Sequence, residues 1–176
     1  MIYVDDAGWL ISEDPEVRIV RLPTVRTCQL KTSAPLGIVW HWTGGVGGAS
    51  YAESLCRRIQ RYRRGIDRPA SWHLLIAKDG TIYQSAPVSV GTWHVGRPGI
   101  VAGQRFANVN HATIGVELEN SGRLRRISDR YYCWPYLLNS HAPEHEQRPD
   151  PRCLVNQARA VRVPGQGIFD SFPTKQ

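Results

Sequence analysis

The feature that most restricts the fold of this chain is an Asp79-Gly80 pair between two runs of β-favouring residues. The runs cover residues 72–77 and 81–84 and contain Trp, Leu, Ile, Thr and Tyr. An Asp-Gly turn between such runs is the strongest local pattern for a β-hairpin. We therefore expect an antiparallel pair of strands near the middle of the chain.

Two further segments predict strands that extend the hairpin into a sheet. Residues 113–119 alternate apolar side chains with Thr, Gly and Glu, which is typical of a strand with one face on a core. Glu117 is expected on the face opposite the apolar side chains. Residues 36–43 form an apolar run bounded by proline and glycine, and we interpret them as a buried strand that ends at His41.

A helix is expected after the first of these strands, within residues 50–65. Ser50 and Glu53 have the spacing of a capping box, in which two side chains bond to free amides of the first turn. Apolar residues then recur at helical spacing on one face, and arginines lie largely outside it. The order of strand, helix, hairpin and strand predicts an α/β fold with a mixed central β-sheet flanked by helices.

Length and charge limit the domain count and the class of partner. A chain of 176 residues can form one domain with a real core, so we interpret 1–176 as a single domain. Its net charge of +7 favours an anionic partner, which includes nucleic acid, a membrane surface or an anionic cell-wall polymer. The four cysteines lack a CxxC pair and are expected to be free thiols.

The first residues are acidic where a secretory signal would be basic, and no apolar run reaches the roughly 18 residues of a membrane span. We expect synthesis in the cytoplasm without a signal peptide, and no stable membrane association.

Four blocks hold the histidine, aromatic and acidic residues that can support chemistry. They are Ile38-Val-Trp-His41-Trp-Thr, Ser71-Trp-His73-Leu-Leu-Ile-Ala-Lys-Asp-Gly80, Gly91-Thr-Trp-His94-Val-Gly and Asn110-His-Ala-Thr-Ile-Gly-Val-Glu117-Leu-Glu-Asn. A histidine at the end of a rigid strand is a common zinc ligand, and a hydrogen-bonded core histidine is the alternative. In this order, within residues 36–120, the blocks resemble the zinc-dependent N-acetylmuramoyl-L-alanine amidases. That family includes phage lysozyme-type amidases, bacterial recycling amidases and peptidoglycan recognition proteins.

The resemblance implies that His41 binds Zn²⁺ and that Glu117 is the catalytic general base. It also implies that Trp72, His73, Trp93 and His94 line the substrate cleft, where each histidine either contacts substrate or supports the structure. Trp72 replaces a tyrosine that helps to stabilise the transition state in some lysozyme-type members. Indole cannot exchange a proton at neutral pH, so this role does not transfer.

The resemblance is weaker after residue 120. Family members carry two further zinc ligands, a histidine and then a cysteine or aspartate, after a helix and in an Asp-Pro-Gly-like segment that this chain lacks. His145 and Cys153 are the alternative ligands, although the stretch between Glu117 and His145 is short and does not have a helical pattern. We therefore expect an irregular insertion at 121–170, and a terminal helix with the last zinc ligands lost by truncation.

The activity implied by the resemblance is hydrolysis of the amide bond between N-acetylmuramic acid and L-alanine in peptidoglycan. The alternative is a peptidoglycan-binding module with an incomplete zinc site. Nucleic-acid binding would depend only on the charge and one basic helix, and we do not expect it. An enzyme of this kind without an export signal would suit a phage endolysin that acts on the cell wall, or an intracellular recycling enzyme.

Overall fold

The computed structural model describes residues 1–44, 50–61, 63, 70–133, 137, 143, 146–157 and 160–170. The chain divides into two compact units, of which the first contains Met1–His41 and Ser50–Leu118 and the second contains Trp42–Ala49 and Glu119–Gln176. No helix in the described ranges is long and apolar enough to cross a membrane.

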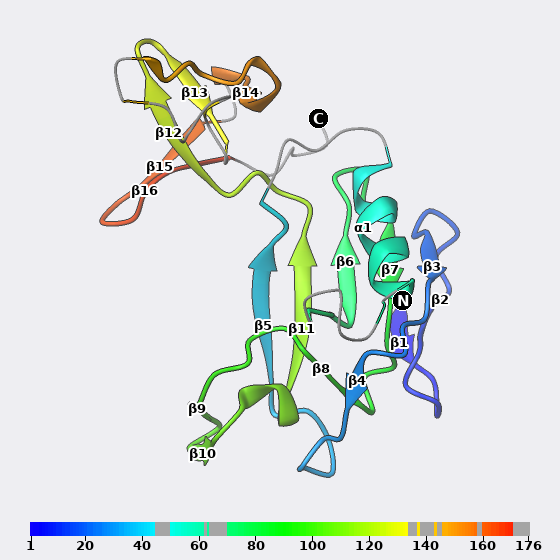
Figure 1. Ribbon diagram of the computed structural model, residues 1–176. Helices are drawn as coiled ribbons and strands as arrows, with labels where there is room; N and C mark the ends of the chain where they lie inside the picture. The colour runs from blue at the N-terminus through cyan, green and yellow to red at the C-terminus, as the bar shows by residue number, and fades with distance from the viewer. Residues whose placement is uncertain are drawn as a thin grey trace. The chain divides into compact units, whose positions relative to one another are not determined.

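The first unit is built on a five-stranded sheet with the order β3-β7-β6-β11-β5 (Figure 1). The strands are β3 (Ile19–Arg21), β5 (Gly37–Trp42), β6 (Leu74–Ile76), β7 (Ile82–Gln84) and β11 (Thr113–Leu118). β6 pairs antiparallel with β7 and parallel with β11, and β3 pairs parallel with β7. The sheet is therefore mixed, and the predicted α/β class is confirmed.

The predicted hairpin joins β6 to β7 through the Asp79-Gly80 turn. Gly80 has φ +86°, a left-handed conformation that glycine adopts without steric cost. Its amide donates to the carbonyl of Ala77, and the amide of Thr81 donates to the Asp79 carboxylate at 2.9 Å. These local bonds fix the register of the two strands.

The helix α1 (Tyr51–Gln60) packs against β6 and β7 and is the only α-helix in the described residues. Its buried face joins side chains of the sheet in one hydrophobic core: Ala52, Cys56, Ile59, Trp72, Leu75 and Tyr83. The helix was predicted correctly, but the capping box is not formed. Ser50 has φ 70° and makes no side-chain cap bond, because an N-cap side chain reaches the first amides from an extended backbone. Glu53 instead pairs with Arg57 at 2.6 Å.

The strand β5 lies at the edge of the sheet, and the prediction that it is buried was wrong. Ile38 and Trp40 point to one face and are 53% and 57% exposed. Val39 and His41 alternate with them and are partly buried. An apolar run predicts a strand, but it does not reveal how many of the strand's faces are covered.

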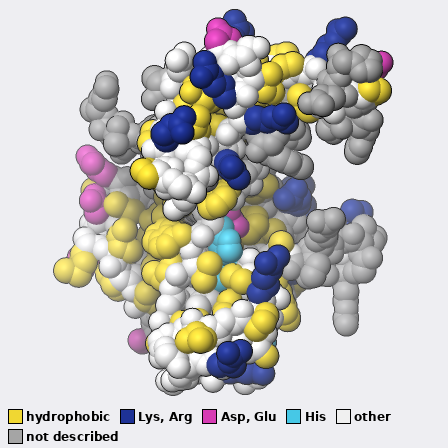
Figure 2. Space-filling model, turned by 90° about the vertical axis from the view of Figure 1, so that its left-hand side faces the viewer, with side chains coloured by type: hydrophobic (Ala, Val, Ile, Leu, Met, Phe, Trp, Pro, Cys, Tyr) yellow, Lys and Arg dark blue, Asp and Glu magenta, His cyan; other side chains and the backbone are white. Residues whose placement is uncertain are grey.

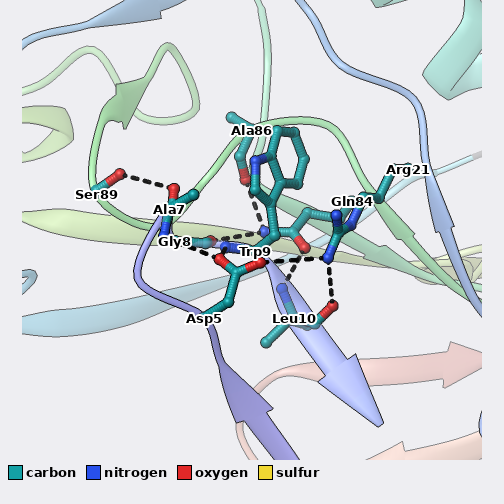
Figure 3. A network of polar contacts seen from close by, with 9 residues as sticks. All are labelled: Asp5, Ala7, Gly8, Trp9, Leu10, Arg21, Gln84, Ala86 and Ser89. Atoms are coloured by element: carbon teal, nitrogen blue, oxygen red, sulfur yellow. Dashed lines mark hydrogen bonds and ion pairs between the residues drawn. The ribbon is translucent and has the colours of Figure 1, made fainter.

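A polar network ties the N-terminal hairpin, β1 (Ile2–Val4) and β2 (Leu10–Ser12), to β7 (Figure 3). The fully buried Gln84 accepts from the amide of Leu10 at 2.7 Å and donates to the carbonyl of Gly8 at 3.1 Å. Asp5 accepts from the amide of Trp9 at 2.7 Å and pairs with Arg21 at 3.5 Å.

Smaller elements complete the first unit. The strands β4 (Thr27–Cys28) and β8 (Gly91–Thr92) pair, as do β9 (Gly99–Val101) and β10 (Gln104–Phe106), and a 3-10 turn covers Val109–His111. The segment from β8 to this turn connects to β11 and carries the third sequence block, and the fourth block begins in the turn and continues along β11.

The second unit contains a five-stranded antiparallel sheet with the order β14-β13-β12-β16-β15. Its strands are β12 (Arg123–Ile127), β13 (Arg130–Tyr132), β14 (Leu154–Val155), β15 (Ala160–Val163) and β16 (Gly167–Asp170), and a 3-10 turn covers Pro151–Cys153. Its core contains Leu124, Tyr132, Cys133, Cys153 and Val155. All four cysteines lie in the described residues, and none of them forms a disulfide.

Residues 121–170 thus contain regular strands where we expected an irregular insertion. The strands are short and rich in arginine, which hides their alternation: Leu124 is buried between the exposed Arg123 and Arg125. Residues 167–170 form β16, and residues 171–176 lie outside the described residues.

Candidate functional site

Two histidines from distant parts of the sequence meet in the first unit. His41 lies near the end of β5, and His94 lies two residues after β8. The distance from His41 Nε2 to His94 Nδ1 is 3.2 Å, and the rings meet edge to face with centroids 5.4 Å apart. Histidine reaches the surface on the face drawn in Figure 2, where hydrophobic, acidic and other side chains lie beside it.

A chain of hydrogen bonds fixes the orientation of His94. Its Nε2 lies 3.2 Å from Thr113 Oγ1, and the Thr113 hydroxyl donates to the carbonyl of Val109 at 2.8 Å. Because a hydroxyl has one hydrogen, Thr113 Oγ1 accepts the proton of His94 Nε2. The bonds therefore assign the neutral tautomer of His94 in which Nδ1 carries the lone pair and faces His41.

The loop that carries His94 is held by Asn110, which is fully buried. Asn110 Oδ1 accepts from the amides of His94, Val95 and Gly96 at 3.3, 2.8 and 3.4 Å. The sequence shows Asn110 in the fourth block, and this position is the only indication of a role. The three hydrogen bonds to the loop could not be predicted, because they depend on tertiary structure.

Burial favours the neutral form of the two meeting histidines. Burial, together with the neighbouring His41 and His73, lowers the pKa of His94 to about 4. Burial also lowers the pKa of His41. Neutral imidazole is the form of histidine that binds metal ions.

His73 is fully buried, and both of its ring nitrogens are engaged. Nε2 donates to the carbonyl of Val90 at 2.8 Å. Nδ1 accepts from the amide of Gly115 at 2.9 Å and lies 3.0 Å from the Thr92 hydroxyl. Of the two roles expected for His73, this placement favours structural support over substrate contact.

The two tryptophans of the predicted cleft differ in exposure. Trp72 is 7% exposed and belongs to the hydrophobic core under α1. Trp93 is 36% exposed, its amide donates to Ser71 Oγ at 2.9 Å, and its ring meets His111 edge to face. Trp93 is therefore the tryptophan of the pair that is available to a ligand.

Glu117 lies on β11 in register with Leu75, a fully buried residue of the α1 core. We expected this carboxyl on the polar side of the strand, but it faces the same side as the core and is partly buried. In the described part of the chain, its Oε2 atom is buried without a hydrogen-bond partner. Burial raises the pKa of Glu117 to about 7, so the group is half ionised at neutral pH.

No group of three or more His, Cys, Asp or Glu side chains is arranged to hold a metal ion in the part of the chain that the structure describes. The ligand types that zinc prefers are present as a pair, because His41 and His94 present two neutral nitrogens to each other. Of the alternative ligands, Cys153 is buried in the core of the second unit. His145 lies outside the described residues.

Comparison with known proteins agrees with the resemblance. Residues 31–161 match the family described as N-acetylmuramoyl-L-alanine amidase. No curated protein matches the chain.

Three of the solved structures with similarity to this chain are the following. A selenomethionine AmpD derivative is 25% identical, covers 72% of this chain and 71% of its own, and has a TM-score of 0.44. A mutant endolysin from Bacillus subtilis is 28% identical, with coverage of 60% and 63% and a TM-score of 0.41. AmiD from E. coli, in complex with anhydro-N-acetylmuramic acid-L-Ala-D-gamma-Glu-L-Lys, is 20% identical, with coverage of 75% and 44% and a TM-score of 0.34.

The family assignment rests on the sequence match, which extends over most of the chain. This protein belongs to the N-acetylmuramoyl-L-alanine amidase family.

Proposed function

We propose that this chain hydrolyses the amide bond between N-acetylmuramic acid and L-alanine in peptidoglycan, with Glu117 as the general base and His41 as a zinc ligand. The observation that carries the proposal is the Glu117 carboxyl, whose buried Oε2 has no hydrogen-bond partner among the described residues and whose pKa is raised by burial to about 7. A carboxyl that only stabilised the fold would be paired or solvated. An isolated carboxyl that titrates near neutral pH is suited to proton transfer.

The proposed reaction needs one proton to move twice. Glu117 removes a proton from water as the water oxygen bonds to the lactyl carbonyl carbon. The same proton then passes to the L-alanine nitrogen as the carbon–nitrogen bond breaks. A pKa near the working pH favours both transfers, because the group is neither too weak as a base nor too weak as an acid.

Zinc, when bound, would act as a Lewis acid that polarises the scissile carbonyl. Burial lowers the pKa of His41, which favours the neutral form of histidine that binds metal ions. Trp93 offers an exposed aromatic ring to the muramyl peptide, and His94 follows it on the loop that Asn110 holds.

The net charge of +7 suits an enzyme that works on an anionic cell wall, as an endolysin does. We propose both that the enzyme acts on the cell wall and that it depends on zinc.

The test uses purified peptidoglycan and measures the release of new L-alanine amino termini with added zinc. Glu117→Gln keeps the shape of the side chain but removes the base, so we expect turnover to fall by about 100-fold or more. Glu16→Gln is the matched control, because Glu16 is exposed in the N-terminal region, and it should retain full turnover.

Two results would contradict the proposal. Full turnover in Glu117→Gln would remove the carboxyl from the chemistry. Binding of peptidoglycan by the parent chain without release of amino termini would favour a binding module instead.

A further inference from the structure

The solvent-facing side of α1 carries a row of arginines. Arg57, Arg58 and Arg61 are exposed, and together with Ser54 they recur at the three- and four-residue spacing that places side chains on one face of a helix. The buried residues of α1 face the sheet at β6 and β7 instead (Figure 1). The arginines are therefore not part of the packing that holds α1 on the sheet.

A surface cavity of about 420 Å³ lies along this side of the helix. The described residues that line it are all exposed: Ser54, Arg57, Arg58, Arg61 and Arg63. We call the four arginines the arginine row. Guanidinium groups present paired N–H donors that match the oxygens of a phosphate, and a serine hydroxyl can add another donor. These lining residues include no carboxylate, so they offer positive charge and hydrogen-bond donors to an anion.

The arginine row carries more positive charge than α1 balances. Arg57 pairs with Glu53, with 2.6 Å between Nη2 and Oε1, and Glu53 is the only acidic residue in residues 51–64. Like charges three or four residues apart on a helix repel each other and lower its stability. The helix dipole favours basic residues in the last turn and offsets part of this repulsion. An anion bound across the row would neutralise the remaining charge.

We propose that the arginine row binds a polyol-phosphate polymer of the cell wall and thereby holds the enzyme on its insoluble substrate. The row runs along the axis of a rigid helix, with Arg57 and Arg61 about 6 Å apart along that axis. Such a line of donors suits a linear polymer that carries a phosphodiester in each repeat. The choice of a wall polymer rests on the proposed function, because that function places the enzyme at the cell wall.

Two other phosphate-bearing partners fit the arginine row less well. Proteins that bind single-stranded nucleic acid combine backbone contacts with aromatic side chains on which bases stack, and the described residues lining the cavity include no aromatic ring. An amphipathic helix binds a membrane through its apolar face, but the apolar face of α1 packs on the sheet. A polymer of phosphates without bases or acyl chains matches the groups that the row presents.

The experiment measures binding of the full chain to purified poly(glycerol phosphate) by calorimetry at low salt. The double variant Arg58→Gln/Arg61→Gln should weaken binding by about tenfold or more, because it removes two charges from the row. Arg97→Gln/Arg105→Gln is the matched control, since it removes the same charge from two exposed arginines outside α1. The control should bind within about twofold of the parent, because charges far from the polymer are screened by salt.

Two further measurements test the geometry and the fold. Arg58→Lys/Arg61→Lys keeps the charge but loses the planar pair of donors, so its affinity should lie between those of the parent and the glutamine variant. Glutamine has nearly the helix propensity of arginine, so urea unfolding of the glutamine variant should give a free energy no lower than that of the parent. A loss of binding with the fold intact then reports on the arginine row itself.

Three outcomes would overturn the proposal. The parent chain could fail to bind poly(glycerol phosphate). The two glutamine double variants could lose the same affinity, which would show that net charge rather than the row attracts the polymer. Single-stranded DNA, or phosphatidylcholine vesicles containing phosphatidylglycerol, could bind through Arg58 and Arg61 more tightly than the polymer, which would assign the row to another class of partner.

The proposed function is tested separately from this inference. Release of L-alanine amino termini is measured on peptidoglycan from which acid has removed the phosphate polymer, and on this substrate Arg58→Gln/Arg61→Gln should retain full turnover. On walls that keep the polymer, the same variant should sediment with the walls less than the parent does. Absence of turnover in a parent chain that binds the polymer would contradict the proposed function alone.

Discussion

Replacing Glu117 with glutamine should make the zinc-free protein more stable at alkaline pH and leave its stability at acid pH unchanged. Burial raises the pKa of this carboxyl from an ordinary 4.5 to about 7, so the folded protein holds the proton more tightly than the unfolded chain. The contribution to stability is fully present below about pH 4.5 and is lost as the pH rises through about 7. Glutamine is neutral throughout and has no such loss.

The change in the free energy of unfolding can be calculated from the difference between the pKa values of Glu117 in the folded and unfolded protein. A change in pKa from 4.5 to about 7 corresponds to at most about 3.5 kcal/mol, at roughly 1.4 kcal/mol for each tenfold change in proton affinity. Glu117 is partly exposed, and solvent screening reduces the expected value to about 2 kcal/mol. This is a large fraction of the stability of a small domain.

The assay is urea unfolding with chelator and reductant, at pH 4 and at pH 8.5, for the parent, Glu117→Gln and the exposed control Glu16→Gln. We expect equal stability of the parent and Glu117→Gln at pH 4, and a gain of about 2 kcal/mol for Glu117→Gln at pH 8.5. The control should follow the parent at both values. A Glu117→Gln effect of the same size at both pH values would show that packing, not the buried charge, separates the two proteins.

Three further predictions concern Glu117, the glycine under the His94 ring and the buried Gln84. The value of kcat/KM should increase as the pH rises through about 7, because Glu117 acts as a base only after it ionises. Values of kcat/KM that do not increase between pH 5 and pH 8 would contradict the role of Glu117 as the base. Gly115→Ala should displace the His94 ring, because an added Cβ would lie 2.5 Å from His94 Cγ, and should lower the free energy of unfolding by about 1–3 kcal/mol in urea titrations. Gln84→Ala should lower the free energy of unfolding by about 2–3 kcal/mol in urea titrations, because it leaves buried backbone groups without partners.

Local patterns in the sequence were enough to predict several elements of the first unit. The hairpin at Asp79-Gly80 and the strand at 113–118 follow from turn chemistry and from alternation, which are properties of neighbouring residues. The exposure of Trp40 and the unused cap at Ser50 could not be predicted, because they depend on which elements pack nearby.

In the candidate site, the sequence likewise predicts local features but not the contacts between distant residues. The sequence identified His41, His94 and Glu117 as separate blocks, but the contact between the two histidines is a property of the tertiary structure. The burial of His73 and its three partners also required the fold, since nothing in its block distinguishes a supporting histidine from one that binds substrate.

The buried amide of Gln84 has a consequence for where this domain physically begins. The family match starts at residue 31, yet the partners of that amide include Gly8 and Leu10, and β3 at Ile19–Arg21 is part of the central sheet. A fragment cut at the family boundary would leave the outer edge of β7 unpaired and the amide facing solvent or an empty space. The first thirty residues therefore pack as part of the first unit, and a recombinant fragment should retain them.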